Sequence, residues 1–399
     1  MPEDPNVLRI AAGLAGSQTF TKQYDLARAT SDRVLAAAER LGDSQLAVRM
    51  LITKGNIAFY QGRLWESIAL VEGARRLAEQ HGHAYLANRA NQSLSNVVAL
   101  DDPRGTADLE RQVVEFARRE GRREQEIITL GNMAEDLRRT GDWEWIQREL
   151  DQAVRDEDRN FTDLFAVSAR DLLLAWQGEL GAEEAAAHAA ALEALDDGDT
   201  SSGANDLRAT LAFTRGDYAE AARQWAVQTE LSDLNAPYGL PKQGLSAVLA
   251  GDAAQAQQAL DRLAVLGSRG RAVETDMAGI RAGIAALAGD VDGALAGYRA
   301  VWAAYGDLGL VWDQALTSIS AGTRLGVADP EIVEWLREGR RTFVKVRAAP
   351  MIAQVDRLLA SADGSNGAFG AGDSGSATQA RQKATVRADQ SPASQSAAT

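Results

Sequence analysis

The chain has 399 residues, of which 45% are hydrophobic, and it carries a formal net charge of −14. It contains no cysteine, which excludes disulfides, zinc–thiolate sites and cysteine nucleophiles and favours a reducing, cytoplasmic location. An acidic surface repels phosphate backbones, so we expect no direct nucleic-acid binding. The sequence has no run of about 18 apolar residues and no signal-peptide pattern, so no membrane contact is expected.

The first predicted helix covers about Val7–Phe20 and is followed by a turn at Gln23. It begins almost at Met1, without the polar capping helix that terminal repeats usually need for solubility. We therefore expect the chain to be the C-terminal piece of a longer architecture, or its first helix to dock on a partner.

The next segment shows a repeating pattern. One amphipathic helix is predicted at about Ser44–Tyr60 and a second at about Leu64–Gln80, with Gly62 in the turn between them. A turn residue of this kind recurs about every 38 residues, a period that two helices and two short turns would fill. We call these nine residues the turn stations: Gln23, Gly62, Asp102, Gly141, Gly178, Gly216, Gly251, Gly289 and Gly326. The repeat predicts an α-solenoid, a fold that serves mainly as a binding scaffold.

Many predicted helix ends carry the dipeptide Gly-Asp. Gly would end one helix in a left-handed conformation, and Asp would cap the next helix. The pairs are Gly42-Asp43, Gly141-Asp142, Gly216-Asp217, Gly251-Asp252, Gly289-Asp290 and Gly306-Asp307.

The last two predicted helices cover about Glu331–Val346 and Pro350–Ala362. From Asp363 onward the chain is rich in Gly, Ser, Ala, Thr and Gln, and it cannot bury enough apolar surface to offset the entropy of ordering. The sequence therefore predicts a helical-repeat solenoid over residues 1–362 and a disordered low-complexity tail over residues 363–399.

Residues around several stations resemble the tetratricopeptide repeat family. The clearest match is Gly216-Asp217-Tyr218 followed by Glu220, Ala221 and Trp225, and another is Gly289-Asp290 followed by Ala294 and Tyr298. The resemblance implies an all-α, right-handed solenoid of about nine helix pairs with a C-terminal cap helix. It also implies that the rings of Trp65, Trp143 and Tyr218 pack where the second helix of a pair begins.

Other segments are similar to the helical C-terminal region of large bacterial signalling ATPases, which join a class III adenylate/guanylate cyclase or a LuxR-type output to a P-loop ATPase and a tetratricopeptide array. These segments are Leu94–Asn96, Asp101–Arg104, Phe116–Gly121, Gly131-Asn132 and Thr140–Trp143. The resemblance implies a non-catalytic interaction and sensing module that regulates a cyclase or ATPase partner. Two alternatives are a small-effector-binding sensor of LuxR or MalT type and a detached C-terminal part of a class III cyclase protein.

The sequence favours no enzyme. It has no P-loop motif, and its only histidines are His81, His83 and His188, so a catalytic triad or a metal site is not expected. We predict no catalytic residue, no cofactor and no metal. His81 and His83 are interpreted as part of a polar turn, and His188 as a surface or packing residue.

The concave face of the solenoid is the predicted binding groove. Arg49 and Arg89 both lie 13 residues before their stations, and Asn56 and Asn96 both lie six residues before theirs. In the resembling family, such inner positions can hold a peptide carboxylate or backbone, for which Arg and Asn have suitable hydrogen-bonding groups. The candidate groove residues for a protein or peptide ligand are Arg49, Asn56, Arg89, Gln92, Asn96, Glu135 and Arg138. The alternative interpretation is that they are ordinary solvated or interhelical polar residues.

Overall fold

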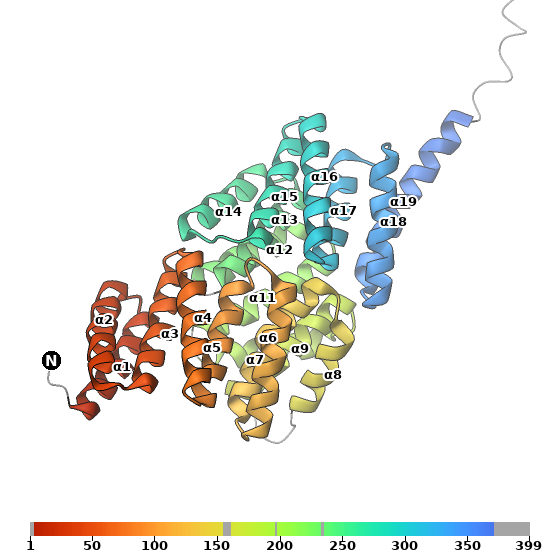
Figure 1. The fold of residues 1–399 in the computed structure, drawn as a ribbon. Helices are drawn as coiled ribbons and strands as arrows, with labels where there is room; N and C mark the ends of the chain where they lie inside the picture. The colour runs from red at the N-terminus through yellow and green to blue at the C-terminus, as the bar shows by residue number, and fades with distance from the viewer. Residues whose placement is uncertain (1–3, 155–160, 196–197, 233–234, 371–399) are drawn as a thin grey trace, which may run out of the picture.

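The computed structural model describes residues 4–154, 161–195, 198–232 and 235–370. Within these ranges the chain forms nineteen helices and no strand. Successive helices pack as nine pairs followed by a single final helix, which confirms the expected all-α solenoid (Figure 1). None of the described helices is long and apolar enough to cross a membrane.

The first five pairs form the lower layer in Figure 1. Their helices are α1 (Pro5–Phe20), α2 (Tyr24–Leu41), α3 (Ser44–Tyr60), α4 (Leu64–Gln80), α5 (Ala84–Val98), α6 (Pro103–Arg119), α7 (Arg123–Thr140), α8 (Trp143–Ala153), α9 (Phe161–Gln177) and α10 (Ala182–Glu193). The predicted bounds of α3 and α4 are confirmed.

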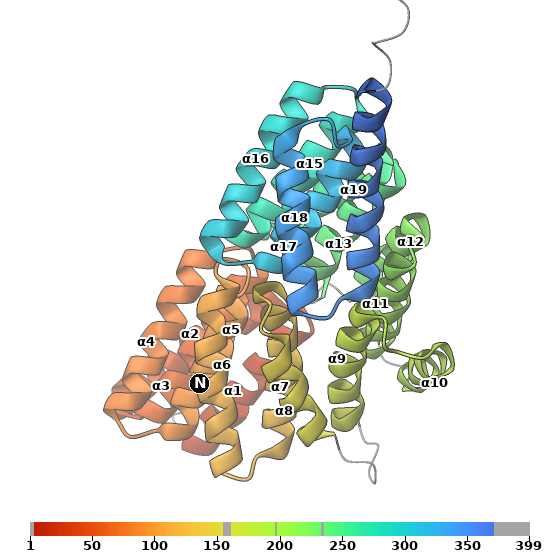
Figure 2. The same ribbon diagram turned by 90° about the vertical axis from the view of Figure 1, so that its right-hand side faces the viewer.

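The remaining helices continue the superhelix and come to lie over the first layer (Figures 1 and 2). They are α11 (Gly198–Thr214), α12 (Tyr218–Leu231), α13 (Ala236–Ala250), α14 (Ala253–Leu266), α15 (Arg271–Leu287), α16 (Val291–Leu308), α17 (Val311–Leu325), α18 (Pro330–Lys345) and α19 (Ala349–Gly370). The final helix is described as far as Gly370, and of the tail predicted over residues 363–399, residues 371–399 lie outside the described residues.

The turn stations have the local conformation that the sequence predicts. All seven glycine stations have positive φ, between 70° at Gly62 and 87° at Gly251. The other two stations, Gln23 and Asp102, are N-cap residues, and the Asp102 carboxylate accepts a bond from the Gly105 N–H at 2.9 Å. The period of the sequence therefore reflects one sharp reversal in each helix pair.

Asp caps follow several of these glycines, as expected. The carboxylates of Asp43, Asp217, Asp252 and Asp290 each accept a bond from the backbone N–H three residues later. The prediction for Gly306-Asp307 is wrong, because both residues lie inside α16, which ends at Gly309 with φ 68°. The extra helical residues carry Leu308 into the apolar cluster around Ala272, and this burial favours continuing the helix.

The aromatic rings expected to pack at the start of the second helix of a pair do so at only two of three positions. Trp143 is buried and Tyr218 is half-buried, but Trp65 is 75% exposed, so its predicted packing role is wrong. Leu64, one residue earlier, occupies the buried position instead, with 6% exposure. Adjacent residues on a helix point in directions about 100° apart, so only one of the two can face the core.

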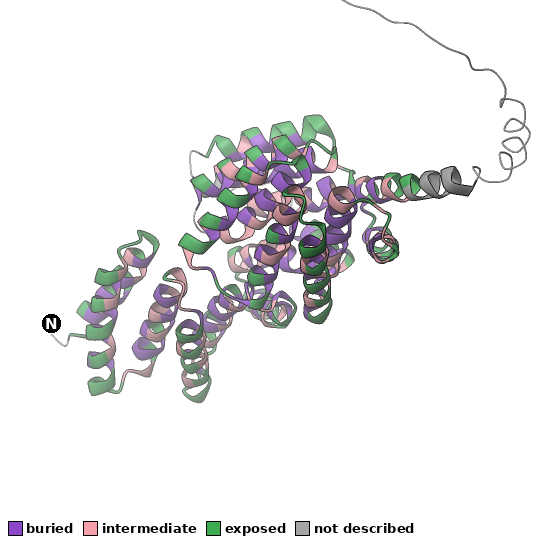
Figure 3. Ribbon diagram, turned by 90° about the horizontal axis from the view of Figure 1, so that it is seen from above, coloured by how far each residue is buried: buried purple, intermediate pink, exposed green. Residues whose placement is uncertain are grey.

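The hydrophobic core differs between the two ends of the chain. Helices α1–α5, which we call the N-terminal arm, bury apolar residues in two local clusters shared between neighbouring helices. Helices α6–α19 are called the body, and most of them share a much larger cluster that runs from Ala107 in α6 to Val355 in α19, while α14 packs in a second cluster formed by α12–α15. Figure 3 shows this burial as stripes along the arm and as a broad interior region in the body.

Within the body the superhelix closes on itself. The ring of Trp312 in α17 lies 4.7 Å from that of Trp143 in α8 and 5.2 Å from that of Trp176 in α9, measured between centroids. The side chain of Gln177 donates to the Val346 carbonyl at 3.1 Å, across 169 residues of sequence. A simple solenoid repeat contacts its neighbours, whereas these helices also contact repeats about half a chain away.

The two layers meet at and next to two of the stations, Gly62 and Asp102. A Cβ on Gly62 would lie 2.7 Å from the Gly267 carbonyl oxygen, so the two turns touch through bare backbone. Nearby, Val273 N–H donates to the Leu100 carbonyl at 3.2 Å, and the Arg271 guanidinium binds Asp101 at 2.9 Å. We call this contact of the α3–α4 and α5–α6 turns with the α14–α15 turn the seam.

Candidate functional site

The first candidate site is a hollow between α1, α3 and α5 with a volume of about 380 Å³. All three are the first helices of their pairs and form the inner face of the arm. We call this site the N-terminal hollow. It is lined by Ala12, Gly13, Gly16, Ser17, Thr19, Phe20, Gln45, Arg49, Met50, Ile52, Thr53, Asn56, Tyr60, Tyr85, Leu86 and Arg89.

Three predicted groove residues, Arg49, Asn56 and Arg89, line this hollow together. Arg49 and Arg89 are exposed, and neither guanidinium has a hydrogen-bond or ion-pair partner among the described residues. Two unpaired guanidinium groups are notable in a chain with a net charge of −14. The hollow therefore offers positive charge and ten N–H donors to an incoming group, at five for each guanidinium.

Two other predicted groove residues lie outside the hollow. The Gln92 side chain accepts a long 3.5 Å hydrogen bond from the Gln125 amide. Asn96 is exposed on α5, although it has the same spacing to its station as Asn56. The structure thus separates two positions that the repeat register treats as equivalent.

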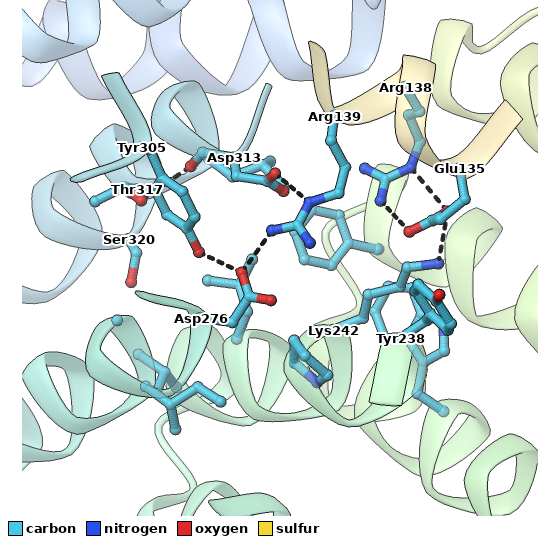
Figure 4. Close-up of a pocket in the computed structure, with 18 of the residues that line it drawn as sticks. Glu135, Arg138, Arg139, Tyr238, Lys242, Asp276, Tyr305, Asp313, Thr317 and Ser320 are labelled. Atoms are coloured by element: carbon cyan, nitrogen blue, oxygen red, sulfur yellow. Dashed lines mark hydrogen bonds and ion pairs between the residues drawn. The ribbon is translucent and has the colours of Figure 1, made fainter. Parts of the chain in front are cut away.

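The last two predicted residues, Glu135 and Arg138, line a separate cavity in the body with a volume of about 80 Å³. We call it the central cavity (Figure 4). It is lined by residues of α7, α9, α11–α13 and α15–α17, which the closure of the superhelix brings together.

One end of the central cavity holds a balanced set of charges. Arg138 Nη2 donates to Glu135 Oε1 at 2.6 Å, and Lys242 Nζ lies 3.3 Å from Glu135 Oε2 and 3.6 Å from Asp206 Oδ2. Burial acts to raise the pKa of Glu135, but Arg138 and Lys242 outweigh it and hold the pKa well below its ordinary value. These contacts join two cations and two carboxylates, and the neighbouring Asp136 is a third buried carboxyl, whose pKa burial and the charge of Glu135 raise to about 8.

The other end holds two carboxylates around one guanidinium. Arg139 Nε donates to Asp313 Oδ2 at 2.6 Å, and Arg139 Nη2 donates to Asp276 Oδ1 at 2.7 Å. The Tyr305 hydroxyl donates to the same Asp276 oxygen at 2.6 Å. Burial raises the pKa of Asp276, and the charge of Asp313 raises it further, while Arg139 opposes both.

Sequence reasoning identified Glu135 and Arg138 but missed Arg139, Asp276 and Asp313. The two carboxylates lie 137 and 174 residues from Arg139, so no local pattern joins them. The one available signal was Asp276 in a largely apolar helix, whose other carboxylate, Glu274, lies in the first turn.

The histidines form no cluster with other ligand residues. His188 is buried, and its Nδ1 lies 2.7 Å from Asp171 Oδ2, so it belongs to interhelical packing. His83 Nε2 lies 2.8 Å from the Ser44 hydroxyl at a turn. Among the described residues, no group of three or more His, Cys, Asp or Glu side chains could hold a metal ion.

No protein-family model matches the chain, and no curated protein sequence matches it significantly. Solved structures with a similar course of helices include the apo form of the quorum sensor NprR from B. thuringiensis, at 10% identity and a TM-score of 0.37 over 89% of this chain and 87% of that chain. Yeast Tom70 is similar at 12% identity and a TM-score of 0.38, over 92% and 91% of the two chains. A circular tandem repeat protein is 16% identical with a TM-score of 0.20, over 89% and 94%. These scores are too low to carry a conclusion about function.

Proposed function

We propose that the chain is a protein-interaction and sensing module whose N-terminal hollow binds an extended peptide segment of a partner protein. The observation that supports this proposal is the pair of unpaired arginines, Arg49 and Arg89, on the same inner surface. Burying a ligand carboxylate against two guanidinium groups gives charge-assisted hydrogen bonds, which are among the stronger contacts a protein makes.

The rest of the hollow suits a peptide backbone and an apolar side chain. Asn56 lies about two helical turns after Arg49 on α3, and its side chain has both a donor and an acceptor for a main-chain amide. Phe20 is 76% exposed and Tyr85 is 40% exposed at the hollow, so they offer apolar surface to a side chain of the partner. The expected ligand is a segment with a C-terminal carboxylate or an acidic residue beside an apolar one.

The proposal for the identity of the partner and of the pathway rests on the sequence resemblance alone. It supports a cyclase or an ATPase of a bacterial signalling or transcription-regulatory system as the partner whose output the module regulates. The same resemblance supports the alternative that the chain is a detached C-terminal part of a class III cyclase protein. Pull-down with the full chain as bait, followed by identification of the captured proteins, tests this assignment.

A random peptide library with free C termini, selected on the full chain, supplies the probe for the hollow. For the selected peptide, Arg49→Ala and Arg89→Ala are each expected to weaken binding by about tenfold or more in fluorescence polarisation. Arg76→Ala is the matched control, because Arg76 is 69% exposed on the neighbouring helix α4, whose residues do not line the hollow. Equal affinity of the double arginine variant and the control would contradict the proposal.

Asn56 and Asn96 provide a second matched pair. Asn56→Ala is expected to weaken binding of the same peptide, because Asn56 lines the hollow, whereas Asn96→Ala is expected to leave it unchanged. Both variants should unfold at the temperature of the parent chain. An equal effect of the two substitutions would place the peptide along the whole predicted groove instead.

A small-effector sensor is the second candidate function, and the central cavity is the observation that favours it. The cavity is ringed by charged and aromatic side chains from eight different helices, including α7, α13, α15 and α17, so an occupant would contact both layers of the superhelix. A thermal shift with a small molecule, and no partner in the pull-down, would favour this candidate over the first.

A further inference from the structure

We propose that the central cavity binds a small primary amine, with its ammonium group between Asp276 and Asp313. This inference rests on the second candidate function, the small-effector sensor, and names the chemistry of its ligand. It is independent of the N-terminal hollow.

The distribution of charge supports a cation. At the Glu135 end of the cavity, Arg138 and Lys242 balance two carboxylates. At the other end, Asp276 and Asp313 share the single guanidinium of Arg139. The side-chain exposures of the three residues are 8%, 13% and 8%, in the order Asp276, Asp313 and Arg139, so water screens the remaining negative charge poorly. A bound anion would add to that charge, whereas a bound ammonium would neutralise it.

The hydrogen bonds leave two carboxylate oxygens for ammonium protons, and the Thr317 hydroxyl, which donates to the Asp313 carbonyl at 2.9 Å, can accept from a third. Asp276 Oδ1 accepts from both Arg139 and Tyr305, and Asp313 Oδ2 accepts from Arg139. The second oxygen of each carboxylate has no hydrogen-bond partner among the described residues, and both side chains line the cavity. Figure 4 shows both carboxylates beside Arg139, with Thr317 and Ser320 close by on the same wall. An ammonium group donates three hydrogen bonds and accepts none, which matches this set of acceptors.

The remaining walls suit a short apolar body. Ile280 and Leu316 line the cavity one helical turn after the carboxylates, and Tyr298 adds aromatic surface that also attracts a cation. Because a cavity of about 80 Å³ has room for only a few water molecules, the ligand must be small. A primary alkylamine of a few carbon atoms fits both the charge and the volume.

Binding is expected to stabilise the closed body. Arg139 comes from α7 in the lower layer, whereas Asp276 and Asp313 come from α15 and α17 in the upper layer. With an ammonium bound, two cations balance the two carboxylates, and the repulsion between Asp276 and Asp313 in the closed body is reduced. An amine that binds the closed body better than the open one would shift the chain toward closure.

The test compares n-butylamine, n-butanol and n-butyrate, three probes of similar size but different charge, on the full chain at pH 7. We expect the amine to raise Tm with increasing concentration by about two degrees or more at saturation, with no shift from the alcohol or the carboxylate. Isothermal titration of the amine should give a one-to-one complex. n-Propylamine serves as a second amine, so that the result does not depend on one chain length.

Two variants locate the site. Asp313→Asn and Asp276→Asn should each abolish the Tm shift with the amine, whereas the control Asp292→Asn, in the first turn of α16, should keep it. Circular dichroism of each variant without ligand shows whether it is folded, and either carboxylate variant alone is sufficient. An unchanged shift in a folded carboxylate variant would overturn the proposed position of the ammonium.

The remaining outcomes separate this inference from the function on which it rests. If the alcohol or the carboxylate shifts Tm and the amines do not, the cavity is a sensor site of different chemistry and the amine inference is wrong. If none of the probes shifts Tm, the inference and the small-effector candidate both fail. The peptide proposal for the N-terminal hollow stands in either case.

Discussion

The N-terminal arm and the body are built from the same helix pairs but differ in what those pairs contact. In the arm, α1–α5 bury apolar residues against neighbouring helices and leave a hollow of about 380 Å³. In the body, helices far apart in sequence share one core, and the cavity left inside is about 80 Å³. The repeat therefore sets the helix pair, and closure of the superhelix decides whether its inner face packs only against neighbouring repeats or also against distant ones.

This difference predicts different stabilities for the two regions. A solenoid in which each repeat contacts its neighbours gains stability roughly as a sum of local terms. The body adds contacts between layers, so its helices should unfold together and at higher free energy than those of the arm. The following substitutions test that contrast, from the largest expected effect to the smallest.

Removing a core ring of the body should have the largest effect. Trp312 is completely buried, and its ring packs against Trp143, Trp176 and Phe343. Trp312→Ala is expected to lower the free energy of unfolding by about 3–5 kcal/mol in urea denaturation. The matched control, Trp65→Ala, removes an indole that is 75% exposed in the arm, and should change stability by about 0.5 kcal/mol or less. Similar losses for the two variants would contradict the contrast.

The cross-layer ion pairs should come next. Arg139→Met leaves Asp276 and Asp313 buried without their cation, which is expected to cost about 3–5 kcal/mol at neutral pH. The loss should shrink as the pH falls, because protonation removes the charge from both carboxyls, and the pKa of Asp276 is already raised by burial. Arg148→Met, at a position 55% exposed, is the control and should show neither effect. A loss independent of pH would mean that packing, rather than charge, explains it.

Asp136 should make stability fall as the pH rises. Burial, followed by the charge of Glu135, raises its pKa from 3.8 to about 8, against the opposing effect of Arg139 and Arg138. The folded chain thus holds a proton that the unfolded chain releases. The resulting stabilisation is complete below about pH 4 and is lost progressively as the pH rises to about 8, by a few kcal/mol at most. Asp136→Asn should flatten urea-denaturation stability across this range and raise it at pH 8, whereas a steeper dependence in the variant would contradict the sign.

The seam should give the smallest change in stability but a clear change in shape. Gly62→Ala places a Cβ 2.7 Å from the Gly267 carbonyl oxygen, at a residue with φ 70°, so the two turns must separate. Gly82→Ala is a close control, because Gly82 has φ 69° and nothing within 4 Å of the added Cβ. Both variants should lose about 1–2 kcal/mol from the left-handed backbone. Small-angle scattering should show a larger radius of gyration for Gly62→Ala alone; equal radii would mean that the seam does not hold the layers together.

Much of the fold could be predicted from the sequence because the relevant signals are local. Glycine stations, Asp caps and amphipathic spacing each act within a few residues, and they placed Ser44–Tyr60 and Leu64–Gln80 at the observed bounds. The two wrong predictions also concern local choices, namely which of two adjacent residues faces the core and at which of two nearby glycines a helix ends. Leu64 rather than Trp65 faces the core, and α16 continues through Gly306 because the next turn buries Leu308.

The candidate sites could be predicted only where one repeat separates the residues. Arg49 and Arg89 occupy equivalent positions in neighbouring repeats, and the structure places both at the N-terminal hollow. Arg139 and Asp313 meet only after the rotation between repeats has accumulated over five stations, from Gly141 to Gly289. The sequence contains no direct measure of that rotation, so the closure, the seam and the central cavity required the structure.

Hydrogen–deuterium exchange of the full chain, followed by mass spectrometry, tests the contrast between arm and body most directly. We predict that peptides from α7, α15 and α17 exchange together and slowly, since these helices join the two layers, and that peptides from α1 and α2 exchange faster. Protection that declines evenly from the middle of the chain toward both ends, with α7, α15 and α17 exchanging independently, would contradict the account.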